Sequence, residues 1–168
     1  MKLKPEITLL LSVLFIAAGI LVTMATGLWQ TESDKVPRTL EITAQTDGVQ
    51  QVQYDPADIR GSYTFKEVSD LFGIPFADLQ AAFGLPEEGA DTFQVKSLET
   101  LLPDTQVEIG TASVRMFVAY YLGIDYTPSE DNYLLETAVS ILKEKGKMSP
   151  VQTAFVESHT AIMNEARE

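Results

Sequence analysis

The feature that most constrains this chain is a long uncharged stretch near its start. Residues 7–31 contain no charged side chain, and the densely apolar part runs from Ile7 to Trp29. A helix rises about 1.5 Å per residue, so roughly 20 such residues cross the ~30 Å hydrocarbon core of a bilayer. Trp29 ends the run, where an amphipathic ring suits the membrane interface. The sequence therefore predicts a transmembrane helix over residues 7–29, within an anchor segment of residues 1–31.

A cleaved signal peptide is the alternative interpretation of the same run. Lys2 and Lys4 supply the basic start that such a peptide needs. However, a cleavable apolar core usually has about 7–15 residues, and the exit after Met24 lacks a clean Ala-x-Ala site. We therefore expect an uncleaved, single-pass signal-anchor in the cell membrane. The basic residues before the run favour a cytoplasmic N-terminus and an extracytoplasmic C-terminal domain, although Lys35 and Arg38 follow the run.

The charge of the chain belongs to the part that follows the anchor. The full sequence carries 24 acidic and 12 basic side chains. Without Lys2, Lys4 and Glu6 the remainder holds 23 acidic and 10 basic groups, a net charge of −13. Such a domain is repelled by nucleic acid phosphates and by anionic headgroups, so we expect no nucleic acid partner and a body held off the membrane. With no cysteine and one histidine, the chain also excludes thiolate and multi-histidine metal sites.

Residues 32–57 are predicted to form a linker and an extended arm. Residues 40–44 and 49–54 alternate apolar and polar side chains on either side of Asp47-Gly48. Alternation around an Asp-Gly pair is typical of a β-hairpin. The many glutamines and threonines indicate a short hairpin or arm that is half exposed.

From residue 58 to 168 the apolar period becomes helical. Thr64-Phe-Lys-Glu67 predicts a capping box, and Gly73 and Gly84 predict left-handed helix ends. Leu71-Phe-Gly-Ile-Pro75 and Ala82-Phe-Gly-Leu-Pro86 repeat one phrase. Two short helices joined by such a tight turn resemble a helix-turn-helix unit. A DNA-reading role needs basic residues on the second helix, but residues 76–83 carry Asp78 and no lysine or arginine.

Further short helices complete the predicted domain. We expect them over residues 97–102, from Thr111 to a stop at Gly123, and over residues 133–145. Ser149-Pro150 is typical of a helix start, and this last helix is expected to run close to the C-terminus. Its inward residues would be Val151, Phe155, Val156, Ile162 and Met163. The predicted fold is mostly α, with a compact bundle of five or six short helices.

Few residues qualify as a functional site. Asp55 and Asp58 lack the pattern of a calcium loop, so turn and cap chemistry explains them and no metal is expected. The sequence has no GxGxxG, Walker A, GxSxG or HExxH motif, and we assign no catalytic, cofactor-binding or metal-binding residue. Because the domain is so acidic, we expect its arginines to pair with carboxylates. We expect the tyrosines to be divided between the core and an exposed aromatic face, and the histidine to form a hydrogen bond with a neighbour. The candidate interaction or structural polar residues are Arg60, Arg115, Tyr120 and His159.

Three phrases carry a resemblance to a known class of protein. They are Asp55 to Pro75, Phe93 to Glu99 and Glu108 to Tyr121. They resemble the C-terminal helical domain of membrane-bound 4Fe-4S polyferredoxin-like proteins, over roughly residues 55–142. The cluster-binding cysteines of those proteins are absent, so the resemblance does not extend to electron transfer. It implies a membrane-tethered accessory domain beside a redox or transport system.

These observations favour a non-enzymatic accessory or protein-binding domain, anchored through residues 7–29 and partnered by a membrane protein. No cofactor is expected. One alternative is a membrane-tethered, hydrolase-like enzyme that uses carboxylates and His159. The other alternative is a structural tether or assembly factor.

Overall fold

The computed structural model describes residues 5–25, 36–40, 53–102 and 107–161. The chain divides into two compact units, Met1–Val36 and Pro37–Glu168. The arm that precedes residue 58 therefore belongs to the same unit as the helical domain. The mostly helical fold class is confirmed, with a small antiparallel strand pair beside the helices.

In the described residues of the first unit, the helix is α1 (Pro5–Ala25). Its side chains are described at Leu9 and over residues 11–22, and all of these are exposed. Within the described part of the chain, no helix combines the length and the hydropathy that a membrane crossing requires. A helix is thus present in the predicted segment, but its described residues do not meet the length and hydropathy of a membrane-spanning helix. Residues 26–29 of the predicted segment lie outside the description.

The second unit begins with an extended arm. Strand β1 (Thr39–Leu40) pairs antiparallel with β2 (Gln53–Tyr54), with Thr39 opposite Tyr54. This antiparallel pairing agrees with the prediction of a hairpin, but its register is shifted by two residues from the one that a two-residue Asp47-Gly48 turn would give. Residues 41–52 lie outside the described part of the chain. A short 3₁₀ helix, η1 (Pro56–Asp58), follows, and Asp55 caps it by accepting a hydrogen bond from the Ala57 amide at 2.9 Å. The Tyr54 ring contacts Phe72 edge-on at 6.3 Å, which holds β2 against the helices.

The repeated phrase builds a tight helix pair. Helix α2 (Phe65–Phe72) starts with the predicted capping box between Thr64 and Glu67 and ends at Gly73, whose φ is 65°. Helix α3 (Phe76–Phe83) ends at Gly84, with φ 60°. These positive φ angles are accessible to glycine without a steric penalty, so both predicted helix ends are confirmed.

The α2–α3 pair differs from a DNA-reading unit in how its second helix is used. Helix α3 packs along α6 (Glu136–Lys145). The Thr137 hydroxyl donates a hydrogen bond to the carbonyl of Ala82 at 2.8 Å and fixes this contact. Much of the surface of α3 is therefore committed to the protein interior.

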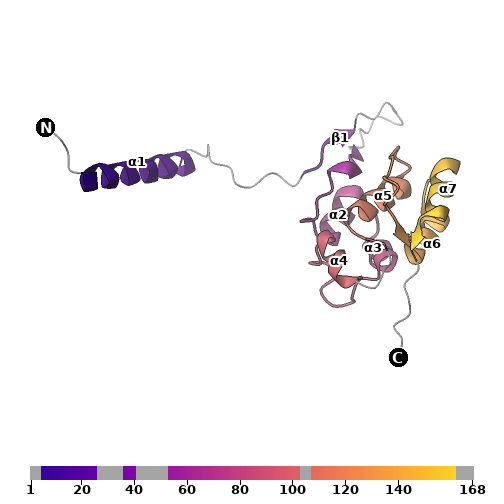
Figure 1. The fold of residues 1–168 in the computed structure, drawn as a ribbon. Coiled ribbons are helices and arrows are strands. Elements are labelled where there is room, and N and C mark those ends of the chain that lie inside the picture. Colours follow the sequence, from indigo (N-terminus) through magenta and orange to yellow (C-terminus); the bar gives the residue numbers. More distant parts are fainter. Residues whose placement is uncertain (1–4, 26–35, 41–52, 103–106, 162–168) are drawn as a thin grey trace. The chain divides into compact units, whose positions relative to one another are not determined.

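The core forms around α5 (Thr111–Leu122), which lies between the α2–α4 side and the α6–α7 side of the domain (Figure 1). Its residues 116–120 are buried almost completely. Phe117 contacts Phe83 and Tyr121, with ring centroids 5.5 and 5.8 Å apart, and Phe83 contacts Phe65 at 5.5 Å. The segment η2 (Val95–Ser97) and α4 (Leu98–Leu101) close one side of this core through buried Val95 and Leu98.

The C-terminal part departs from the prediction in three places. Leu134–Leu135 form a strand, β3, before α6 begins, and they pair in parallel with β4 (Thr160–Ala161). Helix α7 (Pro150–Ser158) starts with the predicted Ser149 cap but ends well before the C-terminus. Val151, predicted to be inward, is 80 % exposed, because it lies about 140° around the helix from the buried Val156. Ile162 and Met163 lie outside the described residues.

Candidate functional site

The most tightly built polar cluster lies where α3, α5 and α6 meet. The carboxylate of Asp78 is buried and accepts a hydrogen bond from the Tyr121 hydroxyl at 2.7 Å and another from the Lys145 ammonium at 2.7 Å. Burial alone would raise the pKa of Asp78, but these two donors outweigh it and lower the pKa below its ordinary value. Burial and the bond to Asp78 raise the pKa of Tyr121 to about 12. The cluster keeps Asp78 ionised and ties three helices together.

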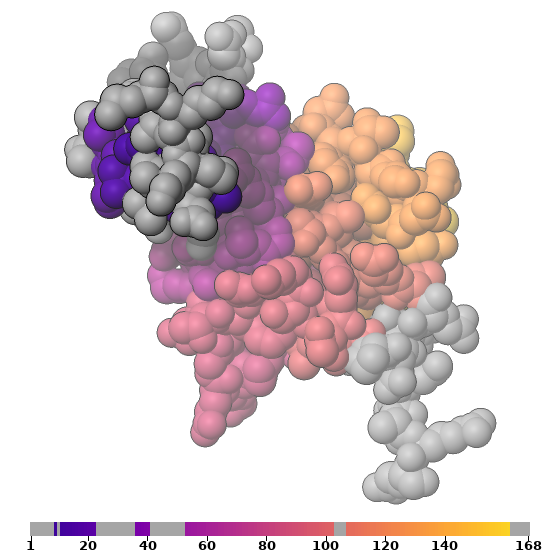
Figure 2. Space-filling model, turned by 60° about the vertical axis from the view of Figure 1, so that its left-hand side comes forward, coloured from indigo at the N-terminus to yellow at the C-terminus, as the bar shows by residue number. Residues whose placement is uncertain are grey.

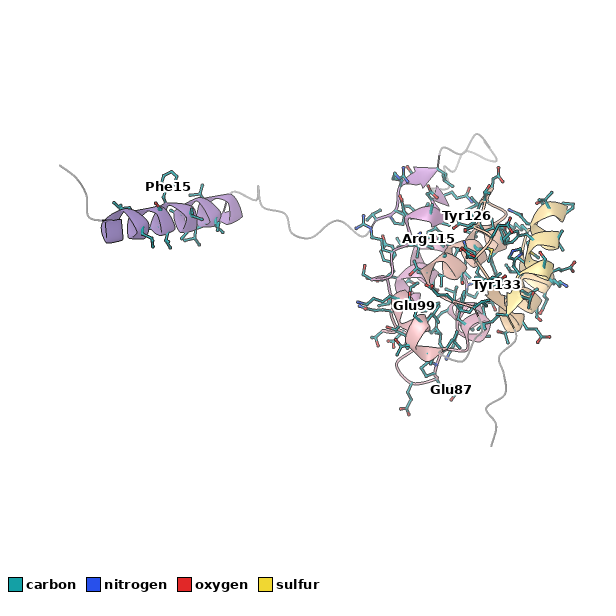
Figure 3. All side chains as sticks on the ribbon, viewed as in Figure 1. Phe15, Glu87, Glu99, Arg115, Tyr126 and Tyr133 are labelled. Carbon is teal, nitrogen blue, oxygen red and sulfur yellow. The ribbon has the colours of Figure 1, made fainter. Side chains whose placement is uncertain are left out.

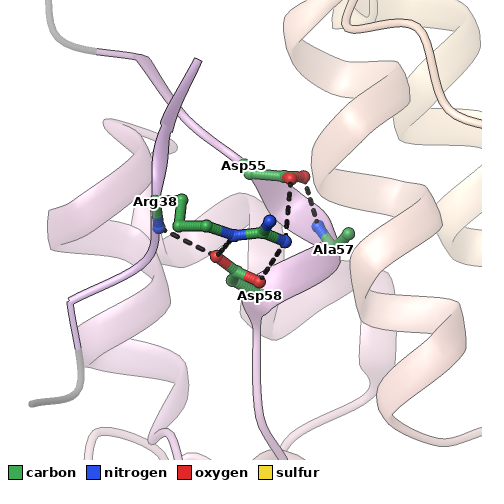
Figure 4. A network of polar contacts seen from close by, with 4 residues as sticks. All are labelled: Arg38, Asp55, Ala57 and Asp58. Atoms are coloured by element: carbon green, nitrogen blue, oxygen red, sulfur yellow. Dashed lines mark hydrogen bonds and ion pairs between the residues drawn. The ribbon is translucent and has the colours of Figure 1, made fainter.

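A second cluster fixes the arm to η1 (Figure 4). The Arg38 guanidinium donates from Nε and Nη2 to the two oxygens of Asp58, at 2.8 and 3.0 Å, and the Arg38 amide donates to Asp58 at 2.9 Å. Asp55 lies 3.8 Å from the same guanidinium. The hydrogen bonds from Arg38 lower the pKa of Asp58 to about 2. Asp55 and Asp58, considered above for calcium, therefore serve as a cap and an arginine partner.

Arg60 and Arg115 both lie near the end of η1. The Nε of Arg115 donates to the carbonyl oxygen of Ile59 at 2.8 Å, so its described partner is the backbone rather than the expected carboxylate. Burial raises the pKa of the Tyr126 phenol, and the positive charge of the nearby Arg115 opposes this rise. Figure 3 shows both side chains in one part of the domain. Arg60 is exposed, and its charge helps to lower the pKa of Asp58.

His159 caps the end of α7 and lies among aromatic side chains. Its ring stacks on Phe155, with centroids 3.9 Å apart and planes within 5°, and lies 5.1 Å from the ring of Tyr133. Nε2 lies 3.6 Å from a carboxylate oxygen of Glu130. This geometry is that of a histidine bonded to its neighbours, as the sequence suggested.

The serine beside His159 contacts its ring at the end of α7. Nδ1 lies 2.9 Å from the Ser158 hydroxyl and 3.0 Å from the Phe155 carbonyl. The Ser158 hydroxyl also donates to the Phe155 carbonyl at 2.9 Å, so these contacts all lie within the last turn of α7 and its C-cap.

The predicted aromatic face is divided between core and boundary. Tyr120 is buried, and burial raises the pKa of its phenol to about 12. Tyr121, Tyr126 and Tyr133 are half buried. Tyr120 thus belongs to the core rather than to an exposed surface.

The structure does not bring the four candidate residues into one site. Arg60 follows η1 and Arg115 bonds Ile59 at its end, Tyr120 lies in the core, and His159 lies at the end of α7. The Asp78 and Arg38 clusters escaped the sequence analysis, because their partners lie 20 to 67 residues apart and share no local pattern. Among the described residues, no group of three or more His, Asp or Glu side chains could hold a metal ion.

Several exposed carboxylates give part of the domain surface a negative charge. Glu87, Glu88 and Asp91 are exposed in the loop that follows α3, and Glu99 and Glu108 add two more. Figure 2 shows the segment that contains this loop projecting from the domain, and Figure 3 places Glu87 at its outer edge.

Comparisons with models of protein families, with curated proteins and with solved structures found no match to this chain.

Proposed function

We propose that this protein is a single-pass membrane protein in which α1 anchors an acidic helical domain that acts as an accessory or binding subunit for a membrane protein. The observation that carries the proposal is the exposure of α1. Nine large apolar side chains of α1 are between 43 and 82 % exposed, and no charged residue occurs from Ile7 to Thr31. Exposed apolar surface of this extent is stabilised by lipid or by an apolar partner.

The charge of the second unit supports a tethered rather than a surface-bound domain. Residues 37–168 carry 21 acidic and 9 basic side chains, a net charge of −12, which the anionic headgroups of a membrane repel. The described polar clusters of the domain hold its helices and arm together, as Asp78 and Asp58 do. A domain held together in this way can bind a partner protein through its exposed surface, and such binding requires no catalytic site. The basic residues before α1 favour an extracytoplasmic domain.

The anchor can be tested by placing charge on α1. Leu14→Lys combined with Phe15→Lys puts two charges in the middle of the apolar run, and each is disfavoured by about 3 kcal/mol at the centre of a membrane helix. We expect the parent chain to stay in the membrane pellet after alkaline carbonate extraction and the double variant to enter the supernatant. Val151→Lys, at an exposed apolar residue of α7, is the matched control and should stay in the pellet. Equal extraction of the parent and the double variant would refute anchoring by α1.

The accessory role is tested by crosslinking in native membranes. Photoreactive groups placed at the exposed Glu87 and, separately, at Leu14 of α1 should give distinct adducts with a membrane protein. The resemblance to membrane-bound 4Fe-4S proteins predicts that this partner belongs to a redox or transport system. Adducts that are absent at both positions would count against a partner and favour a tether without one.

A further inference from the structure

We propose that residues 149–161, which contain α7 and β4, form a strap that opens as a unit while the rest of the second unit stays folded. The strap follows α6 after residues 146–148 and lies beside α6, in yellow in Figure 1. The Lys147 amide donates to the Tyr120 carbonyl at 3.0 Å, so the chain is still held to α5 just before the strap begins. All of these residues belong to the second unit, so the strap is independent of how α1 is anchored.

Apolar burial holds the strap at few points. Of the nine residues of α7, all of them described, Val156 is the buried one and Phe155 is half buried, and β4 adds the buried Ala161. Val151 and Ala154 are exposed on α7. Helix α5, in contrast, buries seven of its twelve residues. Because apolar stabilisation grows with the area removed from water, α7 is held less firmly than α5.

Polar contacts hold the strap at its edges. Glu157 pairs with Lys143 of α6 at 2.8 Å, and both side chains are exposed. The Gln152 side chain donates to a carbonyl in the loop after α5 at 3.1 Å. The His159 ring adds its contacts with the loop before β3, and β4 pairs with β3 over two residues. An element with few buried apolar contacts and with exposed polar ones opens at a lower free energy than the core.

The short length of α7 makes the strap open as a unit. A helix of nine residues is not stable in water without packing against other elements, so α7 unfolds once Val156 leaves the core. The Leu134 amide of β3 donates to the carbonyl of His159, the residue that ends α7, at 3.0 Å. The β3–β4 pairing therefore loses its support when α7 unfolds.

Opening uncovers surface that the closed domain hides. It breaks the pairing of Leu134–Leu135 with β4 and exposes the side of α6 that α7 and β4 contact. An unpaired strand edge readily pairs with another chain, so the closed strap protects this edge of β3.

The absence of cysteine allows the opening to be measured by thiol labelling of the full chain in detergent micelles. Val156→Cys on α7 and, separately, Val118→Cys on α5 replace two fully buried valines by thiols that react only when their helix opens. We expect labelling at position 156 to be at least about 100-fold faster than labelling at position 118. Val68→Ala, in the buried core of α2, should then speed labelling at position 118 by about tenfold or more. It should leave the rate at position 156 unchanged, because α2 stays folded when the strap opens.

Hydrogen exchange in the parent chain tests the joint opening without any substitution. The Leu134 amide and the His159 amide, which donates to the carbonyls of Phe155 and Val156, should have the same protection factor. Both should be less protected than the amides of residues 116–120 in α5.

Two outcomes would overturn the strap. Equal labelling rates at positions 156 and 118, both raised by Val68→Ala, would show that α7 opens only when the whole domain unfolds. A Leu134 amide as protected as residues 116–120, beside a His159 amide that exchanges faster, would show that α7 and β4 do not open together. Both readouts lie within the second unit, so they are independent of whether carbonate extraction supports anchoring by α1.

Discussion

Helices α1 and α5 are both rich in apolar residues, but their side chains have opposite surroundings. Phe15 on α1 is 82 % exposed, whereas Phe117 on α5 is completely buried. In α5 the aromatic contacts with Phe83 and Tyr121 give Phe117 its surroundings within the domain. The described side chains of α1 are exposed on the helix, and Figure 3 shows Phe15 projecting from it. The difference teaches that apolar content alone does not make a core helix.

The largest effect that separates the two helices is expected from truncating the matched phenylalanines. Phe117→Ala removes a fully buried ring and should lower the free energy of unfolding of the domain by about 3–5 kcal/mol. Phe15→Ala should leave that free energy unchanged. Urea unfolding followed by tyrosine circular dichroism measures both, because every tyrosine lies in the second unit. A loss below about 1 kcal/mol in Phe117→Ala would contradict the buried position.

A smaller effect is expected from the polar cluster that fastens α5 to its neighbours. Asp78→Ala leaves Tyr121 and Lys145 without their acceptor and should lower the free energy of unfolding by about 2 kcal/mol. Asp70→Ala removes an exposed pair with Lys66 and should change it by less than about 1 kcal/mol. Equal losses in the two variants would contradict the buried role of Asp78.

The contribution of Asp78 also has a defined pH dependence. Its pKa is lowered in the folded state, so its contribution is fully present above the ordinary value of 3.8 and declines as the pH falls through the lower folded value. The difference in unfolding free energy between the parent and Asp78→Ala should therefore be constant near neutral pH and shrink below about pH 4. If the difference in unfolding free energy between the parent and Asp78→Ala grew as the pH fell, the pKa of Asp78 would be raised rather than lowered in the folded state.

The smallest effects are expected at two glycines that end helices of the domain. Gly73 has φ 65° and nothing within 4 Å of an added Cβ, so Gly73→Ala should cost about 1 kcal/mol from backbone strain alone. Gly123 has φ 74°, and an added Cβ would lie 2.8 Å from Lys147 Cβ and 3.1 Å from its carbonyl oxygen. Gly123→Ala should therefore destabilise the domain more than Gly73→Ala in the same unfolding experiment. The reverse order would contradict the close approach at Gly123.

Local signals predicted much of the fold. The Thr64 capping box, the stop at Gly73 and the Ser149 cap each depend on residues within a few positions, so the sequence shows them directly. The parallel pairing of Leu134–Leu135 with Thr160–Ala161 depends on residues 26 positions apart and has no such signal. Helix α7 ends at Ser158 because His159 leaves the helical conformation and its carbonyl accepts a bond from Leu134.

The candidate residues were harder to predict than the helices. The sequence identified His159 and the arginines by their scarcity, but scarcity does not identify partners. Arg115 binds a backbone carbonyl, which residue types cannot reveal. The sequence shows Asp78 only as an acidic residue of the second helix of the repeat, whereas its role depends on Lys145, which lies 67 residues away.

The central claim, that α1 and the domain lie in lipid and in water respectively, is tested most directly by fluorescence quenching. Single cysteines in place of Phe15 and of Val151, both at least 80 % exposed, carry the same environment-sensitive label in the full chain inserted into phosphatidylcholine vesicles. Brominated lipids should quench the label at position 15 and spare the one at position 151, whereas aqueous iodide should do the opposite. Iodide quenching that is equal at the two positions would contradict the account.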